Sequence, residues 1–137
     1  MDNIFIKQNV SQHEYTTHKY VYDLNIVNIP EIVSYCPDTK VMEMKKVHGL
    51  SVSDWYGDQI DLVPNPVYEN IVEIVRKLMM HGICYPDFTG YNFMITEADM
   101  NSEQLIIWII DFEHASINEH MNNVCMNGLK LWNPDFA

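Results

Sequence analysis

The spacing of apolar and polar residues predicts a strand and then a helix at the start of this chain. In residues 3–8 two isoleucines alternate with a phenylalanine and a lysine, which is typical of a strand with two different faces, and Lys7 would project from it. Ser11 and Glu14 have the Ser-x-x-Glu spacing of a capping box, which pairs backbone donors of the first helical turn. We therefore expect a helix from Ser11 to about Asn25.

A hairpin and a long amphipathic helix follow. Two short apolar strands, 32–35 and 39–44, are separated by a Cys-Pro-Asp turn. The clearest helix begins with Asn65 as the predicted cap and Pro66 at the first helical position, and it ends at Gly82. Its predicted buried face consists of Val67, Ile71, Ile74, Val75 and Leu78.

The rest of the pattern is strand-rich. Residues 45–65 are predicted to be irregular apart from a short helix near 52–56. Strands are expected at 93–96 and 105–110, and the continuous apolar run of the second predicts burial on both faces. A last short helix is expected at 119–127. The predicted order is therefore β-α-β-β, then α, then β-β, an α+β arrangement.

Length and charge limit the class of protein. With 137 residues, the chain is predicted to form one domain, 1–137. Its formal net charge of -11 argues against nucleic acid and anionic membrane surfaces as partners, because both would be repelled. There is no apolar stretch of about 20 residues, and the first residues do not resemble a secretion signal, so we expect a cytoplasmic location.

Cysteine and histidine do not suggest a metal site. Cys36, Cys84 and Cys125 are widely spaced and are predicted to be reduced thiols. His13 and His18 are five positions apart and would not share a helix face well, so zinc is not expected. Abundant Asn, Ile, Met and Tyr are typical of an AT-rich coding genome, such as that of a large DNA virus or an intracellular microbe. A viral protein would act in the host cytoplasm.

Two segments carry candidate chemistry. In Tyr-Pro-Asp-Phe-Thr-Gly-Tyr-Asn, residues 85–92, Asp87 precedes Asn92 by five positions, and in Ile-Ile-Asp-Phe-Glu the acid is Asp111. A carboxylate can act as a base, and carboxylate and amide oxygens suit a hard cation that bridges phosphate oxygens. Together the two segments resemble the catalytic loop and the metal-binding loop of kinase-like phosphotransferases.

The resemblance implies a reduced protein-kinase-like fold. It would consist of a small N-terminal β-α-β-β part, about 1–44, and a truncated helical C-terminal part, 45–137, that bears the catalytic-loop hairpin. The Asp-Phe-Glu tripeptide brings the chain closer to atypical kinases and to aminoglycoside and choline phosphotransferases than to conventional protein kinases.

The resemblance also implies a role for each polar residue. Asp87 matches the catalytic base, and Asn92 and Asp111 match the Mg²⁺ ligands. Lys7 matches the lysine that holds the phosphates of ATP, and Glu14 matches the acid that orients this lysine. A strand lysine is also commonly just solvated, and the capping box alone accounts for Glu14.

The adenine side of the site would lie further along the chain. Residues 41–49 resemble the strand and hinge that offer backbone hydrogen bonds to adenine, which makes Glu43 and Met44 candidate nucleotide neighbours. The alternative is an ordinary edge strand. Trp132 and Phe136, near the end of the chain, would either dock on the core or cover an acceptor or partner surface.

Three functions remain open from the sequence. The first is an atypical kinase-like phosphotransferase that uses ATP and Mg²⁺ and moves the γ-phosphate to a hydroxyl acceptor. The second is a pseudokinase-like module that binds a protein partner, which is favoured by the lack of a glycine-rich loop and by the 24 residues that follow Glu113. The third is an α+β scaffold that binds no nucleotide. A homo-oligomer is conceivable, because a second subunit could complete an exposed nucleotide cleft.

Overall fold

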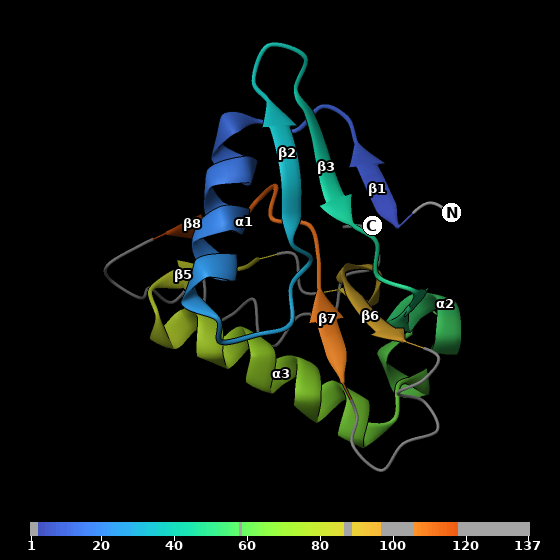
Figure 1. Ribbon diagram of the computed structural model, residues 1–137. Helices are drawn as coiled ribbons and strands as arrows, with labels where there is room; N and C mark the ends of the chain where they lie inside the picture. Colours follow the sequence, from blue (N-terminus) through green and yellow to red (C-terminus); the bar gives the residue numbers. More distant parts are fainter. Residues whose placement is uncertain (1–2, 58, 87–88, 97–105, 118–137) are drawn as a thin grey trace.

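A computed structural model describes residues 3–57, 59–86, 89–96 and 106–117 of the chain (Figure 1). The order of its elements contains the predicted β-α-β-β start, the long helix and the two later strands. In chain order they are β1 (Ile4–Lys7), α1 (Gln12–Leu24), β2 (Ile32–Cys36), β3 (Val41–Lys45), β4 (Gly49–Ser51), α2 (Val52–Tyr56), the 3-10 turn η1 (Ile60–Leu62), α3 (Asn65–Met80), β5 (Ile83–Cys84), the 3-10 turn η2 (Gly90–Asn92), β6 (Phe93–Thr96), β7 (Ile107–Ile109) and β8 (Ser116–Ile117).

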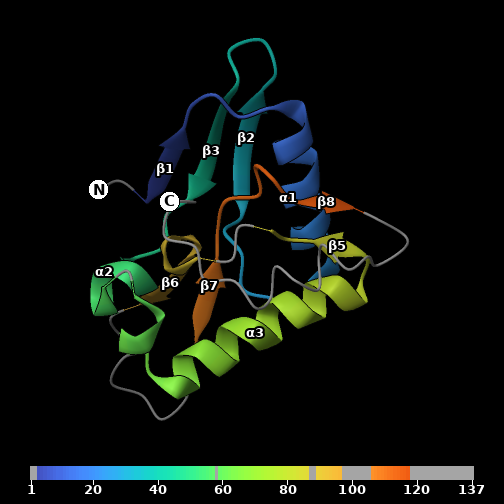
Figure 2. The same cartoon turned by 180° about the vertical axis from the view of Figure 1, so that it is seen from behind.

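The N-terminal part is an antiparallel sheet in the order β1-β3-β2, with α1 beside it (Figures 1 and 2). In the register of β1 and β3, Phe5 lies opposite Met44 and Lys7 lies opposite Met42. Residues paired directly across antiparallel strands point to the same face, so these four side chains share one face of the sheet. Met42 and Met44 are buried there with Val10.

Helix α1 begins as predicted and has an unusual buried face. The Ser11 Oγ accepts a hydrogen bond from the Glu14 N–H at 3.0 Å, and the helix ends at Asn25, which has the left-handed φ of 55°. The buried residues of the helix are mostly polar: Glu14, Thr17, His18 and Val21. Buried polar groups are costly unless they are paired, so this face requires partners from the rest of the fold.

The second part consists of a β4-β6-β7 sheet above α3 (Figure 1). The predicted apolar face of α3 is confirmed, and the buried residues of the helix are Val67, Ile71, Ile74, Val75, Leu78 and Met79. The prediction of Asn65 as the cap is wrong. Pro64 holds that position, because its carbonyl already accepts hydrogen bonds from the N–H groups of Val67 and Tyr68. Gly82, with a φ of 79°, follows the helix as expected.

Two strand predictions need correction. The run 105–110 is not buried on both faces, because β7 buries Ile107 and Ile109 while Trp108 is only half-buried. Trp108 lines two surface cavities. Strand β4 lies in a segment predicted to be irregular. A Cβ on Gly49 would lie 2.3 Å from the Ile95 carbonyl oxygen, so β4 approaches β6 too closely for a side chain.

The prediction of three reduced thiols is also wrong, because it fails for Cys84. Cys36 is free and exposed, whereas Cys84 is disulfide-bonded, because sequence spacing does not reveal which cysteines meet in space. The predicted helix 119–127 and the tail residues Trp132 and Phe136 lie outside the described residues. Of the helices that are described, none has the length and apolarity to cross a bilayer.

Candidate functional site

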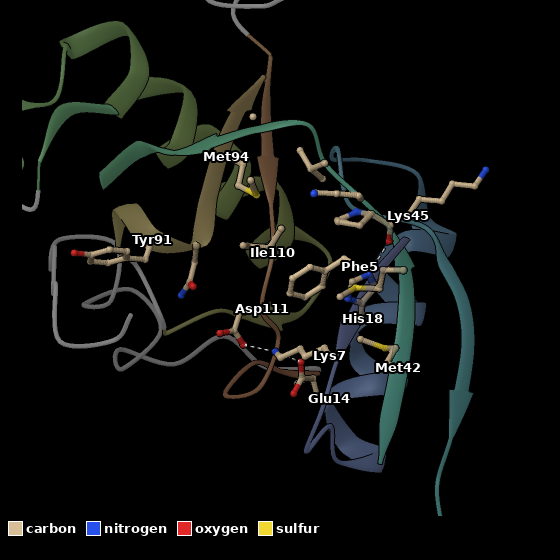
Figure 3. Close-up of a pocket in the computed structure, with 16 residues that line it drawn as sticks. Phe5, Lys7, Glu14, His18, Met42, Lys45, Tyr91, Met94, Ile110 and Asp111 are labelled. Atoms are coloured by element: carbon tan, nitrogen blue, oxygen red, sulfur yellow. Dashed lines mark hydrogen bonds and ion pairs between the residues drawn. The ribbon is translucent and has the colours of Figure 1, made fainter. Parts of the chain in front are cut away.

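A cavity of about 420 Å³ lies between the β1-β3-β2 sheet and the β4-β6-β7 sheet (Figure 3). One wall comes from β1, β3 and α1, and the facing wall comes from η2, β6 and the segment that follows β7. Binding pockets for small molecules commonly have volumes of about 300–1,000 Å³. The cavity is therefore large enough for a small-molecule ligand.

Lys7 joins two acids from distant parts of the chain at one end of this cavity. Its Nζ lies 2.5 Å from the Glu14 Oε2 and 3.3 Å from the Asp111 Oδ1 (Figure 3). The short path from β1 to α1 depends on Asn9, which adopts a left-handed φ of 60° and turns the chain sharply. Glu14 thus reaches Lys7 even though the two are only seven residues apart.

Burial and charge set the ionisation of the Lys7–Glu14 pair. Burial alone would lower the pKa of Lys7, but the hydrogen bond to Glu14 and the charge of Asp111 more than offset this effect, so the pKa is raised. The Glu14 side chain is 2% exposed, and burial raises its pKa although Lys7 opposes the rise. Lys7 therefore stays protonated at neutral pH and supplies a fixed positive charge to the cavity.

Asn92 and Asp111 also line this cavity. Asn92 is buried at the end of η2, and its backbone carbonyl accepts a hydrogen bond from the Ile110 N–H at 2.9 Å. Asp111 has a φ of 65°, a left-handed conformation that Asp tolerates better than most residues, and its Oδ1 also accepts a hydrogen bond from the Glu113 N–H. The turn after β7 thus places this carboxylate beside Asn92 on the cavity wall.

The oxygen atoms of Asn92 and Asp111 suit Mg²⁺. This ion prefers oxygen ligands, keeps several waters and commonly uses one or two protein side chains together with substrate phosphates. No cluster of three or more His, Cys, Asp or Glu side chains that could hold a metal occurs within the described part of the chain. The two side chains therefore fit a metal that a phosphorylated ligand helps to bind, and do not fit a metal held by protein ligands alone.

A buried aromatic residue supports the Asp111 turn. The ring of Phe112 is fully buried and makes edge contacts with His18, at 5.3 Å, and with Tyr85, at 5.4 Å between ring centres. The Tyr85 hydroxyl donates to the Ile110 carbonyl at 2.5 Å. His18 donates from Nε2 to the Pro30 carbonyl at 2.7 Å, and burial lowers its pKa. The position of Asp111 is thus fixed by contacts on both sides.

The two predicted neighbours of the nucleotide lie on opposite faces of β3. Met44 lines the cavity, whereas Glu43 is paired with Ile6 on the other face and accepts a hydrogen bond from the Ser34 hydroxyl at 3.2 Å. At the end of β3, the N–H of its last residue, Lys45, donates to the Glu31 carbonyl, and the N–H of the following Lys46 donates to the Asn3 carbonyl. These two backbone donors are therefore already paired within the protein.

The predicted base, Asp87, lies outside the described residues. Sequence reasoning did not single out the apolar residues of the cavity, among them Phe5, Met42, Met94 and Ile110. Phe5 could have been found, since it is two positions before Lys7 and therefore shares its strand face. The others could not be found without the fold, because their segments meet only in three dimensions.

No family model matches this chain, but solved protein kinases share its fold. The Rio2 kinase from Chaetomium thermophilum, in a complex with ADP, Mg²⁺ and phosphoaspartate, matches with a TM-score of 0.66 and 22% identity over 86% of this chain and 35% of the Rio2 chain. The kinase PK-1 of the Cydia pomonella granulovirus matches with a TM-score of 0.61 and 13% identity over 83% of this chain and 43% of its own. The Rad53 kinase domain matches with a TM-score of 0.61 and 17% identity over 82% of this chain and 42% of its own.

These matches correspond to the described architecture, with its mixed helices and antiparallel sheets and its cavity between them. The chain spans less than half the length of each matching kinase chain. At such low identity the likeness concerns the fold alone. The chain therefore has an α+β, protein-kinase-like fold in a reduced form.

Proposed function

We propose that this chain binds ATP together with Mg²⁺ in the cavity and transfers the γ-phosphate to a hydroxyl acceptor. The observation that carries the proposal is that the Lys7 Nζ lies within 3.3 Å of carboxylate oxygens of both Glu14 and Asp111, in a cavity that Asn92 also lines. A fixed cation beside two oxygen ligands is the combination that a polyphosphate with a hard cation requires.

Each residue has a distinct task in this proposal. Lys7, held by Glu14, would bind phosphate oxygens of the nucleotide, and Asn92 and Asp111 would hold the metal. Mg²⁺ bound there would reduce the negative charge that opposes attack on the γ-phosphorus. The acceptor oxygen would form a bond to the γ-phosphorus while the bond to the β-phosphate oxygen breaks, ADP would leave, and Asp87 would take the hydroxyl proton.

Thermal unfolding with ATP alone, Mg²⁺ alone and both together tests the nucleotide site. A ligand at 100 times its dissociation constant adds about 2.7 kcal/mol to the free energy of unfolding, so ATP with Mg²⁺ should raise the melting temperature of the wild type clearly. Asp111→Asn should abolish the part of the rise that needs Mg²⁺, because it removes the carboxylate charge. Asn tolerates the left-handed φ of 65° at this position, so the backbone should be preserved.

A matched control shows whether the effect of Asp111→Asn is specific to the cavity or would follow from the removal of any carboxylate. Asp61→Asn removes a carboxylate from the exposed turn η1, which does not line the cavity, and should leave the ATP and Mg²⁺ effect unchanged. If ATP with Mg²⁺ does not raise the melting temperature of the wild type, the proposed nucleotide site is wrong. If nucleotide binds but γ-phosphate from labelled ATP never reaches protein or small hydroxyl acceptors, only the transfer step is wrong.

A second function is favoured by one specific observation. The N–H groups of Lys45 and Lys46 donate to the carbonyls of Glu31 and Asn3, which leaves fewer backbone donors for a base at the end of β3. A pseudokinase-like module that binds a protein partner would need no such donors. This function predicts no effect of ATP on the melting temperature, and it predicts co-purification of a partner that is retained by the Asp111→Asn variant.

A further inference from the structure

Two adjoining cavities lie at Trp108 in β7, apart from the Lys7 cation and its acids. Their volumes are about 640 and 430 Å³, and Tyr22, Ile29 and Trp108 line both of them. Figure 1 shows the connection from α1 to β2 passing beside β7, and Asn28 in this connection forms a parallel bridge with Trp108. The shared residues join the two cavities into one extended depression, which we call the Trp108 groove.

Two aromatic side chains with polar ends face this groove. The neighbours of Trp108 in β7, Ile107 and Ile109, are buried, and alternation along the strand directs the half-buried indole to the opposite face. Within the described part of the chain, the indole N–H of Trp108 has no hydrogen-bond partner. Tyr22 is 36% exposed. Tryptophan and tyrosine are the residues that, with arginine, most often dominate the binding energy of protein interfaces.

The charges of the groove differ between its two ends. Lys45, Lys46 and His48 lie at the end next to β3, whereas Asp23 lies at the other end. Lys45 is paired with Glu31 at 2.9 Å. Lys46 is exposed and forms no ion pair with any of the described residues. The end next to β3 therefore offers an uncompensated positive charge, although the chain as a whole has a net charge of -11.

These features suit an acidic polypeptide segment better than a small molecule or a nucleic acid. Together the two cavities reach the upper limit of sites for small molecules, about 300–1,000 Å³. A peptide carbonyl can accept the hydrogen bond that the Trp108 N–H has to give. A nucleic acid would be repelled by the net charge, whereas a short segment can pair with Lys46 because charges beyond about 8 Å are largely screened at physiological salt.

We propose that the Trp108 groove is a docking site for a segment of a partner protein that carries a bulky apolar side chain close to an acidic one. The apolar side chain would pack against Tyr22 and Trp108, and the acidic one would pair with Lys46. Neither Lys7 nor Asp111 lines the groove, so docking of this kind does not depend on nucleotide binding.

Selection from a library of short random peptides displayed on phage tests the groove without knowledge of the natural partner. The wild type, Trp108→Ala and Lys46→Glu are each used for selection at about physiological salt. Docking predicts that the wild type enriches peptides with Asp or Glu close to a bulky apolar residue. Trp108→Ala should enrich none of these peptides, and Lys46→Glu should enrich peptides with Lys or Arg in place of the acid.

Fluorescence anisotropy with a synthetic peptide of the enriched sequence then measures each contact. Trp108→Ala should weaken binding at least about 30-fold, as expected for a residue that dominates an interface. Replacing the acid of the peptide by its amide should weaken binding to the wild type and strengthen binding to Lys46→Glu, because the sign of the charge at position 46 is reversed.

A charge control comes from α1. Lys19 is exposed and lines neither cavity of the groove, so Lys19→Glu makes the same change of charge elsewhere and should bind the peptide as the wild type does. Melting temperatures show that each variant is folded. Tyr22→Ala removes an exposed ring from the groove and replaces Trp108→Ala if the latter does not fold.

Three results would overturn the docking role. The first is a wild type that enriches no peptide sequence. The second is an enriched peptide that binds Trp108→Ala or Tyr22→Ala as tightly as the wild type, because it would then contact another surface. The third is a set of enriched peptides that lack an acidic residue, or whose binding responds equally to Lys46→Glu and Lys19→Glu.

Discussion

Removal of the Lys7 charge should destabilise the protein even when no ligand is present. In Lys7→Met, the Glu14 carboxylate, which is 2% exposed in the wild type, loses the ammonium group 2.5 Å away. Removing one partner of a buried ion pair lowers the free energy of unfolding by about 3–5 kcal/mol, because the remaining charge is left without compensation. Lys7 itself is 26% exposed, so solvent screens part of this cost. We therefore expect a loss of about 2–3 kcal/mol in the free energy of unfolding.

Urea unfolding followed by tryptophan fluorescence at pH 7.5 measures this loss. It corresponds to a fall of roughly 8–12 °C in the melting temperature for a domain of this size. The double variant Lys7→Met/Glu14→Met removes the uncompensated acid as well and should regain most of the lost stability. Lys45→Met is the matched control, since Lys45 pairs with Glu31 at an exposed position and its loss should change stability far less.

Two results would refute this account of the pair. One is a Lys7→Met protein as stable as the wild type. The other is a double variant that is no more stable than the single one, since this would show that Lys7 stabilises the fold by packing and not by neutralising Glu14.

Three further variants or conditions test other parts of the structure. Gly49→Ala should lower the free energy of unfolding, measured with urea, by about 1–3 kcal/mol, because the new Cβ would lie 2.3 Å from the Ile95 carbonyl oxygen. Unchanged stability would contradict the close approach of β4 and β6. Tyr85→Phe should lower the free energy of unfolding by about 1–2 kcal/mol, because the Ile110 carbonyl would lose the hydroxyl that donates to it at 2.5 Å. A more stable variant would contradict that role. Burial lowers the pKa of His18 from its ordinary value of 6.5, so below about pH 6.5 the unfolded chain takes up a proton that the folded protein does not, and stability should fall as the pH falls. His18→Gln should weaken this fall between pH 6.5 and 5, and an unchanged pH profile would contradict the assignment.

The local elements could be predicted because short-range spacing determines them. The Ser11 cap depends on residues three apart, and the buried face of α3 depends on a repeat of 3.6 residues. Strand β4 was missed because three residues that include Gly49 carry no periodic pattern. The half-buried state of Trp108 was missed because it depends on how many layers cover the sheet, which is a property of the whole fold.

Only part of the site could be predicted from the sequence. Lys7 and Asp111 are 104 positions apart, and no local pattern brings them together, so their proximity could be expected only from the resemblance to kinase-like proteins. Met44 and Glu43 were treated alike, although alternation along a strand places adjacent side chains on opposite faces. Phe5 was overlooked although strand alternation places it on the same face as Lys7, two positions later.

The burial of Phe112 also determines which orientation of Asp111 is populated when no ligand is bound. An arrangement with Asp111 turned away from Lys7 would draw Phe112 out of its contacts with His18 and Tyr85 and leave a void of the size of a ring. Losing a buried Phe side chain costs about 3–5 kcal/mol, and each 1.4 kcal/mol is a factor of ten in population. Fewer than about one molecule in a hundred would then adopt the turned-away state. Under the proposed function, ligand binding would then need no prior conformational change of Asp111.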